Sequence, residues 1–426
     1  MRYALINGII LDGTKDMAPR YDEVIIVEDG VIQEIFPAGR NLSGMEVVDL
    51  EGRYIMPGLI NLHVHLPGSG KPQKEPMDVK KVVGIVTKNE LTMKAAEKLC
   101  AGYAKTALMS GVTTIRTVGG IGDIDTRIRD KVERGKLMGP RILASNMAIS
   151  VPGGHMAGSL AYEAHSAEEA RFDVDLVAQE GPDFIKLMVT GGVMDAEVVG
   201  EPGVLRMAPE LVRAATDRAH ALGLKVAAHV ESTEGVRVAL ANGVDSIEHG
   251  AEPDEDIMRL FKETGAAHVC TISPALPYAL FDRNVSHATA EQQMNGKVVL
   301  DGIIDCAKAC LAAGVPVGLG TDVGCPFVTH YDMWRELAYF VKYCGVTPAF
   351  ALHTATLLNA QIAGIDHLTG SIEVGKAADM IITRDNPLVR PHALRNVSMV
   401  IKEGALIVEP KVKKIDLCEK ELDKFV

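Results

Sequence analysis

Side chains that bind metal ions recur at the ends of short apolar runs in this sequence. His63 and His65 lie two residues apart in the run MPGLINLHVHL. On a β-strand, residues two apart point to the same face, so both imidazoles would leave one side of the strand together. Two histidines on a strand are also a common polar face, so this pair alone does not establish a metal site.

Lys186 stands in FIKLMV, a run that is otherwise apolar on both faces of a predicted strand. A bare ammonium group there would carry a large desolvation cost unless it is paired or neutralised. One interpretation is a salt bridge to Asp183 or Glu201. The other is a neutral amine that carbon dioxide carboxylates, so that the carbamate oxygens bridge two metal ions. The position in the sequence leaves both interpretations open.

Three further donors end predicted strands, namely His229 in KVAAHV, His249 in DSIEHG and Asp322 in VPVGLGTD. Active-site groups of a barrel lie at the carboxyl ends of its strands, so these side chains would share one rim. An aspartate after a strand can also cap a helix. Six nitrogen and oxygen donors that converge on one rim are nevertheless difficult to explain by packing: His63, His65, Lys186, His229, His249 and Asp322.

Such a rim predicts two divalent metal ions. Imidazole and carboxylate ligands suit Zn²⁺ first, with Mn²⁺, Co²⁺ or Fe²⁺ as alternatives. Two ions about 3.5–4 Å apart share one bridging hydroxide, lower its pKa and polarise the carbonyl that it attacks. Asp322 would take the proton of that hydroxide and deliver it to the leaving nitrogen.

Eight short runs rich in Val, Ile and Thr must position these donors, and longer stretches of helical periodicity separate them. This alternation predicts an α/β fold, a (β/α)₈ TIM barrel. Helices are expected at 208–222 and 233–242, with Gly243 as a left-handed cap after the second. The predicted strands are residues 56–66, 113–119, 141–146, 184–189, 225–230, 245–250, 266–273 and 315–322.

The two ends of the chain have a different pattern from its centre. YALINGIIL, EVIIVEDGVIQEIF and MEVVDLEGRYI alternate and are broken by glycine turns, as antiparallel strands are, and ADMIITRD and VSMVIKEGALI do the same. We therefore predict a small β-sandwich domain from residues 1–57 plus 366–426, with the barrel at 58–365. Residues 67–110 are expected to form a capping excursion followed by a helix.

Composition excludes several classes of function. The chain has 426 residues and a formal net charge of −12, and it shows no basic stripe, so we expect no nucleic-acid partner. Seven cysteines without a CxxC pair indicate a reduced compartment, and Cys306 and Cys310, four apart in a predicted helix, are interpreted as two half-buried thiols. The sequence has no leader-like N-terminus and no apolar run of 18 residues, so we expect a cytoplasmic protein without membrane contact. We also expect a homo-oligomer that acts on a small-molecule substrate.

Taken together, these segments resemble the amidohydrolase superfamily, and within it the imidazolonepropionase-like group with its prolidase and metallo-carboxypeptidase members. The resemblance implies that the six rim residues are ligands of a binuclear centre and that Lys186 is N6-carboxylysine. Mononuclear deaminases of the superfamily lack that lysine, which favours amide hydrolysis here. The motifs span nearly the whole chain: MPGLINLHVHL, GVTTIRTVGG, PGGH, DFIKLMVTGG, AAHVES, GVDSIEHG, GLGTD, HTATLLNAQIAG and GSIEVGKAADMII.

Three residues are candidates for substrate contact through the same resemblance. His155 in PGGH matches a family histidine that contacts the substrate's carbonyl or carboxylate, and Arg237 matches a position that helps to hold a carboxylate. Relatives often carry His or Tyr two residues after His229, whereas this chain has Glu231. Glu231 would then accept a hydrogen bond from a substrate donor or cation, or form an ion pair with Arg237.

These observations favour a binuclear metal-dependent hydrolase that cleaves the amide bond of a dipeptide or N-acyl amino acid with a metal-bridging hydroxide. The reaction would be of the dipeptidase, metallo-carboxypeptidase or linear amidase type. A hydrolase of a non-peptide amide or urea, such as a toxin or herbicide, is the first alternative. A mononuclear deaminase or cyclic amidase is the second. A binding or assembly protein that has lost its ligands is disfavoured because the ligand set is complete.

Overall fold

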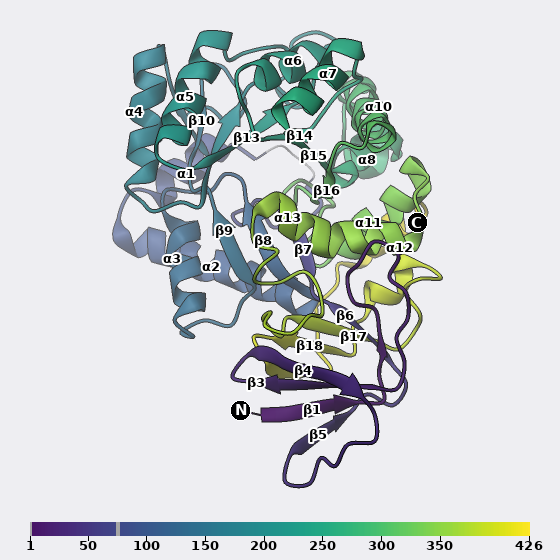
Figure 1. Cartoon of the computed structure of the whole chain (residues 1–426). Coiled ribbons are helices and arrows are strands. Elements are labelled where there is room, and N and C mark those ends of the chain that lie inside the picture. The colour runs from purple at the N-terminus through teal and green to yellow at the C-terminus, as the bar shows by residue number, and fades with distance from the viewer. Residues whose placement is uncertain (1, 74–76) are drawn as a thin grey trace.

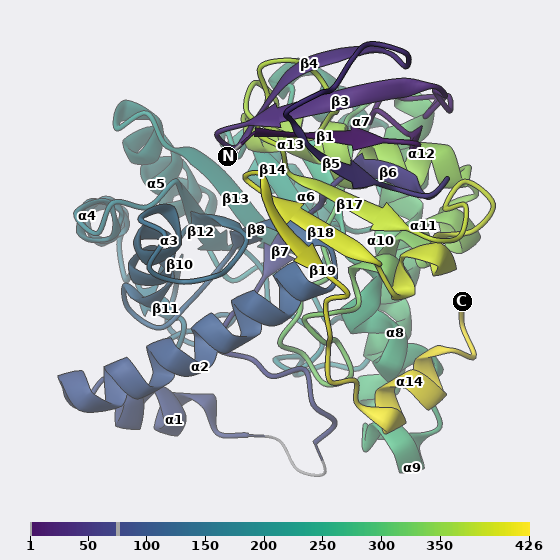
Figure 2. The same ribbon diagram turned by 90° about the horizontal axis from the view of Figure 1, so that it is seen from below.

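The computed structural model describes residues 2–73 and 77–426. Parallel strands surrounded by helices form its centre, and two further sheets lie beside them at one end (Figure 1). Within the predicted excursion at 67–110, residues 74–76 lie outside the described part. The rest of that excursion contains helices α1 (Val79–Val86) and α2 (Glu90–Met109), which lie together on one side of the molecule (Figure 2).

The central strands form two parallel sheets, and each of the eight predicted segments contains one of them. Strands β10 (Ala148–Ser150) and β11 (Ala161–Glu163) are additional to the prediction. The first sheet has the order β7-β8-β9 and the second β11-β10-β12-β13-β14-β15-β16. The predicted strands are β7 (Leu59–Val64), β8 (Val112–Thr117), β9 (Arg141–Ala144), β12 (Phe184–Met188), β13 (Lys225–Val230), β14 (Ser246–His249), β15 (Ala267–Cys270) and β16 (Val317–Leu319).

Backbone hydrogen bonds connect the two parallel sheets at β7 and at β9, the two outer strands of the first sheet. The segment after β16 reaches β7, because Asp322 N–H donates to His63 O and His65 N–H donates to Val323 O, both at 2.9 Å. On the other side, Asp183 N–H donates to Ala144 O at 2.8 Å, which joins the start of β12 to β9. These contacts bring the carboxyl ends of β7 and β16 side by side.

Helices follow the central strands and cover them. The two that were predicted in detail are α5 (Pro209–Ala221) and α6 (Thr233–Ala241), and Gly243 after α6 has φ +88°, as a left-handed cap requires. The others are α3 (Ile124–Glu133), α4 (Ala167–Ala178), α7 (Glu255–Thr264), α8 (Ile272–Leu280), α9 (Arg283–Ser286), α10 (Ala290–Ala313), α11 (Met333–Cys344), α12 (Pro348–His353), the π-helix η1 (Thr354–Leu358), α13 (Asn359–Ala363), the 3₁₀-helix η2 (Pro391–Arg395) and α14 (Asp416–Leu422).

The two sheets at the end of the molecule combine both ends of the chain. One has the order β4-β3-β1-β5, and the other has the order β19-β18-β17-β6-β2, in which C-terminal β17 pairs antiparallel with N-terminal β6. Buried side chains from both sheets share one hydrophobic cluster, which includes Leu5, Ile55 and Ile382. The strands are β1 (Arg2–Ile6), β2 (Ile9–Ile10), β3 (Glu23–Glu28), β4 (Val31–Pro37), β5 (Glu46–Asp49), β6 (Tyr54–Pro57), β17 (Met380–Thr383), β18 (Met399–Lys402) and β19 (Ala405–Val408).

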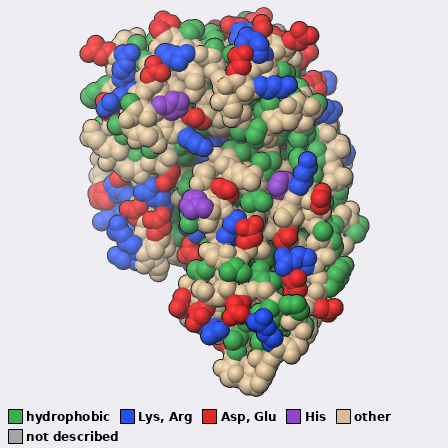
Figure 3. Space-filling view, viewed as in Figure 1, with side chains coloured by type: hydrophobic (Ala, Val, Ile, Leu, Met, Phe, Trp, Pro, Cys, Tyr) green, Lys and Arg blue, Asp and Glu red, His purple; other side chains and the backbone are tan. Residues whose placement is uncertain are grey.

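Acidic and basic side chains are interspersed on the face of the molecule that Figure 3 shows, without a continuous basic stripe. In the described part of the chain, no helix has the length and apolar character needed to cross a lipid bilayer.

Candidate metal centre

Predicted rim donors from the first and eighth strands meet in the structure. His63 is in β7 and His65 follows it, while Asp322 lies three residues after β16. Asp322 Oδ1 is 3.5 Å from His63 Nε2 and 3.3 Å from His65 Nε2. The ring centroids of His63 and His249 are 4.8 Å apart. One ligand atom each from His63, His249 and Asp322 lie within 4.8 Å of one another, a spacing that could hold a metal ion.

A second group of donors shares His249 with the first. The rings of His229 and His249 are 4.7 Å apart, and ligand atoms of His229, Glu231 and His249 lie within 4.8 Å of one another. Glu231 is half-buried beside these rings, and its Oε2 has no hydrogen-bond partner in the described chain. Glu231 therefore faces the rings of His229 and His249.

Each ring at the rim is fixed by a hydrogen bond from the nitrogen that points away from the centre. His63 Nδ1–H donates to Glu248 Oε2 at 2.7 Å, and His65 Nδ1–H donates to Gly119 O at 2.9 Å. His229 Nε2–H donates to Gly191 O at 3.1 Å, and His249 Nδ1 is 2.7 Å from Thr271 Oγ1. Such outer contacts fix the tautomer and orientation of metal-binding imidazoles.

Glu248 is a site residue that the sequence analysis missed. It is 0% exposed, and besides His63 it accepts hydrogen bonds from Arg116 at 2.6 Å and from Ser246 Oγ at 2.7 Å. Arg116 in turn donates to Leu62 O at 2.7 Å, in the same strand as His63. The Glu248 carboxylate is fully buried, and three hydrogen-bond donors compensate its charge. It can therefore orient the His63 ring without the cost of an unpaired buried charge.

Lys186 is 1% exposed, and its Nζ has no hydrogen-bond partner among the residues that the structure describes. The salt-bridge interpretation lacks support, because Asp183 instead accepts from Arg129 at 2.9 Å and from the amide of Ala144 at 2.7 Å. No ion pair joins Lys186 to Glu201 in the described residues either. A buried, unpartnered amine is rare in native proteins and fits a group that is normally modified or ligated.

Burial controls the charges of these groups. It lowers the pKa of Lys186 to about 8, assisted by nearby Arg116 and opposed by Glu248. It also lowers the pKa of His249 to about 3 and that of His63 and His229 well below the ordinary value. Burial opposes ionisation of Asp322, but the nearby His63 and His65 outweigh it and lower the pKa of that carboxyl. His63, His229 and His249 are thus neutral imidazoles and Asp322 is a carboxylate, the forms that bind a divalent cation.

The backbone at the rim is locally strained. His249 has φ +69° and Asp322 has φ +53°, in the left-handed region that non-glycine residues seldom adopt. Such conformations cost on the order of 1–3 kcal/mol each and cluster at functional sites. Gly320 is needed for close approach, since a Cβ there would lie 2.5 Å from the Cβ of His63.

The rim opens into a cavity of about 770 Å³. His155, on the loop between β10 and β11, lines this cavity and stacks on His229 with ring centroids 4.2 Å apart. Its Nδ1–H donates to Asp195, a second residue that the sequence analysis missed. Much of the remaining wall is apolar and comes from α1 and α2, including Val82, Val83, Val86, Ala96 and Leu99.

Arg237 is the predicted site residue that the structure does not bring to the cavity. It lies on α6, and its guanidinium pairs with Glu234 at 3.2 Å and Asp254 at 2.5 Å. It is absent from the cavity lining, and no contact joins it to Glu231 in the described chain. The Glu231–Arg237 ion pair is therefore not formed, because acidic neighbours on the outer surface already hold the arginine.

Comparison with known proteins places this architecture in a family. A solved structure of a candidate prolidase from Bifidobacterium longum is 36% identical, covers 99% of this chain and 98% of its own, and has a TM-score of 0.87. A Xaa-Pro dipeptidase with methionine in its active site is 29% identical, with coverage of 96% and 100% and a TM-score of 0.81. Ochratoxinase of Aspergillus niger is 27% identical over 386 residues, covering 84% of this chain and 76% of its own. Imidazolonepropionase of Symbiobacterium thermophilum is 27% identical over 431 residues, with coverage of 94% and 93%.

These relatives imply a TIM-barrel fold with mixed α/β content and a hydrolase that acts on carbon–nitrogen bonds. Members of the family generally use metal ions, and the cluster of His63, His249 and Asp322 fits that chemistry. The model of the amidohydrolase family matches residues 54–407, and this chain belongs to that family.

Proposed function

We propose that this protein is a binuclear metal-dependent hydrolase that cleaves the amide bond of a dipeptide or an N-acyl amino acid. The convergence of neutral imidazoles, one carboxylate and an unpartnered buried lysine on one rim carries the proposal. His63, His65 and Asp322 would hold one divalent ion and His229 and His249 the other, with Zn²⁺ first because its preferred ligands are these. The bound ions would supply activated water and polarisation of the scissile carbonyl.

Lys186 would complete the centre as N6-carboxylysine. Its neutral amine adds to the carbon of CO₂, a C–N bond forms, and one proton leaves to give a carbamate. Burial favours the neutral amine that this addition requires, Nζ has no partner among the described residues, and Lys186 lines the cavity at the rim. The carbamate converts a buried cation, which repels metal ions, into an anion that binds them.

Asp322 would move the proton in the reaction. Its carboxylate lies between His63 and His65, where it stays ionised and can accept a proton from the attacking water at a carboxylate oxygen. It then gives that proton to the departing nitrogen. Proton transfer by a positioned side chain contributes roughly 10²–10⁴-fold to such reactions.

His155 and Glu231 would orient the substrate at the mouth of the rim. Asp195 holds the His155 ring through Nδ1, and the protonated form of the ring would donate from Nε2 to the substrate's carbonyl or carboxylate. The free Oε2 of Glu231 would accept from an amide N–H or an ammonium group of the substrate. The apolar wall from α1 and α2 suits a hydrophobic acyl group or side chain.

A hydrolase of a non-peptide amide or urea is the second candidate. The similarity to ochratoxinase and the large apolar wall of the cavity favour it. A mononuclear deaminase or cyclic amidase has less support, because it leaves Lys186 without a role.

The experiment is a substrate panel with released amine as the readout. Dipeptides and N-acyl amino acids with small or large apolar groups are compared with aryl amides and ureas, before and after chelation. The proposal expects metal-dependent cleavage of peptide or N-acyl bonds with a preference for apolar groups. Cleavage of ureas and aryl amides alone would instead establish the second candidate, and release of free ammonia from cyclic amidines would establish a deaminase.

We further propose that the eight central strands close into one barrel over residues 58–365 and that residues 1–57 plus 366–426 form one β-sandwich domain. The hydrogen bonds between β7 and the segment after β16, and the hydrophobic cluster shared by the two end sheets, support this division. Limited proteolysis should cut first near the two junctions. We retain the expectation of a homo-oligomer, which light scattering tests.

A further inference from the structure

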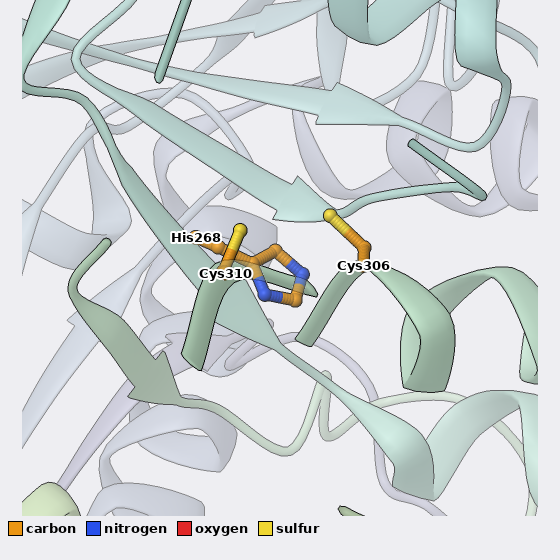
Figure 4. A group of neighbouring side chains, drawn as sticks. All are labelled: His268, Cys306 and Cys310. Atoms are coloured by element: carbon orange, nitrogen blue, oxygen red, sulfur yellow. The ribbon is translucent and has the colours of Figure 1, made fainter. Parts of the chain in front are cut away.

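Three metal-binding side chains lie together outside the rim, between β15 and α10. His268 comes from β15, and Cys306 and Cys310 come from α10 (Figure 4). One ring nitrogen of His268 and the two sulfur atoms lie within 4.8 Å of one another. All three residues are 0% exposed, so the sequence-based expectation of half-buried thiols is wrong. We call these three residues the thiol cluster.

The elements that carry the thiol cluster fix its shape. Cys306 and Cys310 are four residues apart, about one helical turn, so both sulfur atoms leave the same face of α10. His268 faces them from a strand that is paired on both sides, with β14 and with β16. The two sulfur atoms on one turn of α10 and the imidazole on the paired strand β15 therefore have fixed positions relative to one another.

His268 has one hydrogen-bonded and one unpartnered ring nitrogen. Its Nε2–H donates to the carbonyl of His249 at 2.7 Å, whereas Nδ1 has no partner among the described residues although it is buried. Nε2 is the nitrogen on the side of the two sulfur atoms (Figure 4), so a metal ion bound there would replace the proton that Nε2 now donates to His249.

The charge balance of the thiol cluster favours a divalent ion. A single thiolate in this dry core would be costly, because burial without a counter-charge penalises an ion. Two thiolates and one divalent cation have no net charge. The neutral imidazole adds a third donor without changing that balance, so a metal-bound thiol cluster suits the apolar interior better than separate ionised groups.

We propose that His268, Cys306 and Cys310 hold a structural Zn²⁺ ion, separate from the rim. Cysteine and histidine are the ligands of structural zinc sites, which are closed to solvent. The expected shell is two sulfur atoms and one nitrogen, with one further light atom completing the tetrahedron. The ion would tie α10 to β15.

X-ray absorption at the zinc edge tests the proposal on the intact protein. A sulfur shell at about 2.3 Å is expected, because Zn–S bonds have that length. The proposed rim donors are nitrogen and oxygen atoms, so a sulfur shell that persists in Cys325→Ala, the thiol beside the rim, reports on the thiol cluster. A spectrum that fits nitrogen and oxygen neighbours alone would overturn the proposal, and no variant is needed to reach that result.

Cobalt substitution assigns the sulfur to particular residues. After metal removal and loading with Co²⁺, the protein should show thiolate-to-cobalt charge-transfer absorption, which Cys306→Ala and Cys310→Ala each remove together with one equivalent of bound metal. Cys270→Ala, a buried thiol on β15, should retain both. Cys325→Ala, whose sulfur lies 3.9 Å from Asp322 Oδ2, should also retain the absorption.

Retention of the absorption in both Cys306→Ala and Cys310→Ala would overturn the proposal. Neither readout uses substrate, so failure of the thiol cluster is distinguishable from failure of the hydrolase assignment. If an alanine variant does not fold, the sulfur shell of the unmodified protein still decides the question.

Discussion

The rim site and the thiol cluster lie on neighbouring strands, yet they differ in ligand type and in access. The rim uses imidazoles and a carboxylate, and it opens into a cavity of about 770 Å³. The thiol cluster uses sulfur donors and is fully buried. Catalytic metal sites keep an open position for water and substrate, whereas structural sites are closed. Under the two proposals, one fold would separate metal chemistry from metal-based stabilisation by burial.

A hydrogen bond of 2.7 Å between His268 and the carbonyl of His249 connects the two regions. His249 is also strained, with φ +69°, so its backbone needs support from its surroundings. The comparison therefore predicts that substitutions at the rim change activity and metal content strongly, and that substitutions further from the metals have progressively smaller effects.

The largest effect is expected for Lys186→Ala. It removes the proposed bridging carbamate, so metal should be lost and kcat/KM should fall by about 10⁴-fold, consistent with several kcal/mol of transition-state stabilisation by metal ions. Kinetics and elemental analysis measure both effects. Short-chain carboxylic acids should restore part of the activity of Lys186→Ala.

Lys186→Arg provides the control for charge. Guanidinium stays protonated and cannot bridge cations, so this variant should remain inactive with or without added carboxylic acids. Full activity in either variant at saturating metal would contradict carboxylation of Lys186.

Asp322→Asn should lower kcat by about 10³-fold with a smaller change in KM, because proton transfer acts in the transition state. The matched control is Asp217→Asn, an exposed aspartate on α5, which should behave like the parent protein. Metal content is measured in parallel. A kcat within a few-fold of the parent would mean that Asp322 does not move the proton.

Glu248→Gln tests the contact behind the rim. It weakens the partner of His63 and Arg116, and loss of such outer partners typically costs about 10–100-fold in metal affinity or activity. Chelator competition measures the metal affinity. Ser246→Ala, which removes one of the other hydrogen bonds to Glu248, should have a smaller effect. Equal effects of the two substitutions would argue against a special role for the His63 contact.

The smallest effect is expected for Glu231→Gln. If Oε2 accepts from the substrate, KM for substrates with a hydrogen-bond donor should rise by about tenfold, which is near the upper end of what one hydrogen bond contributes. Substrates that lack the donor should be unaffected. An unchanged ranking across the substrate panel would show that Glu231 does not contact the substrate.

The sequence predicted the residues near the strand ends well, because a polar side chain at the end of an apolar run lies at the carboxyl end of a buried strand, where the rim of a barrel is. His63, His229 and Asp322 were found in this way, and the unpaired state of Lys186 agrees with the desolvation argument. The same argument applied to the glutamate in DSIEHG would have found Glu248. Its partner His63 is 185 residues away, however, so the role of that carboxylate could not be predicted from local pattern.

Loop and helix positions were less predictable. Asp195 contacts His155 from a loop 40 residues further along the chain, beyond β11, α4 and β12, and no local periodicity describes that contact. Arg237 was predicted at the site by resemblance, but its acidic neighbours Glu234 and Asp254 hold it on the surface. Burial of Cys306 and Cys310 depends on how α10 packs, and their spacing of four residues fixes only their common face.

Metal titration of activity tests the central claim most directly. The experiment uses the Cys306→Ala variant, which lacks the thiol cluster, after a chelator has removed its metal. Zn²⁺ is added stepwise in the presence of a dipeptide or N-acyl amino acid. Released amine and bound zinc are measured at each step. The account predicts no cleavage without metal and full activity at two equivalents bound in this background. Full activity in the metal-free protein, or at one equivalent, would contradict a binuclear hydrolase.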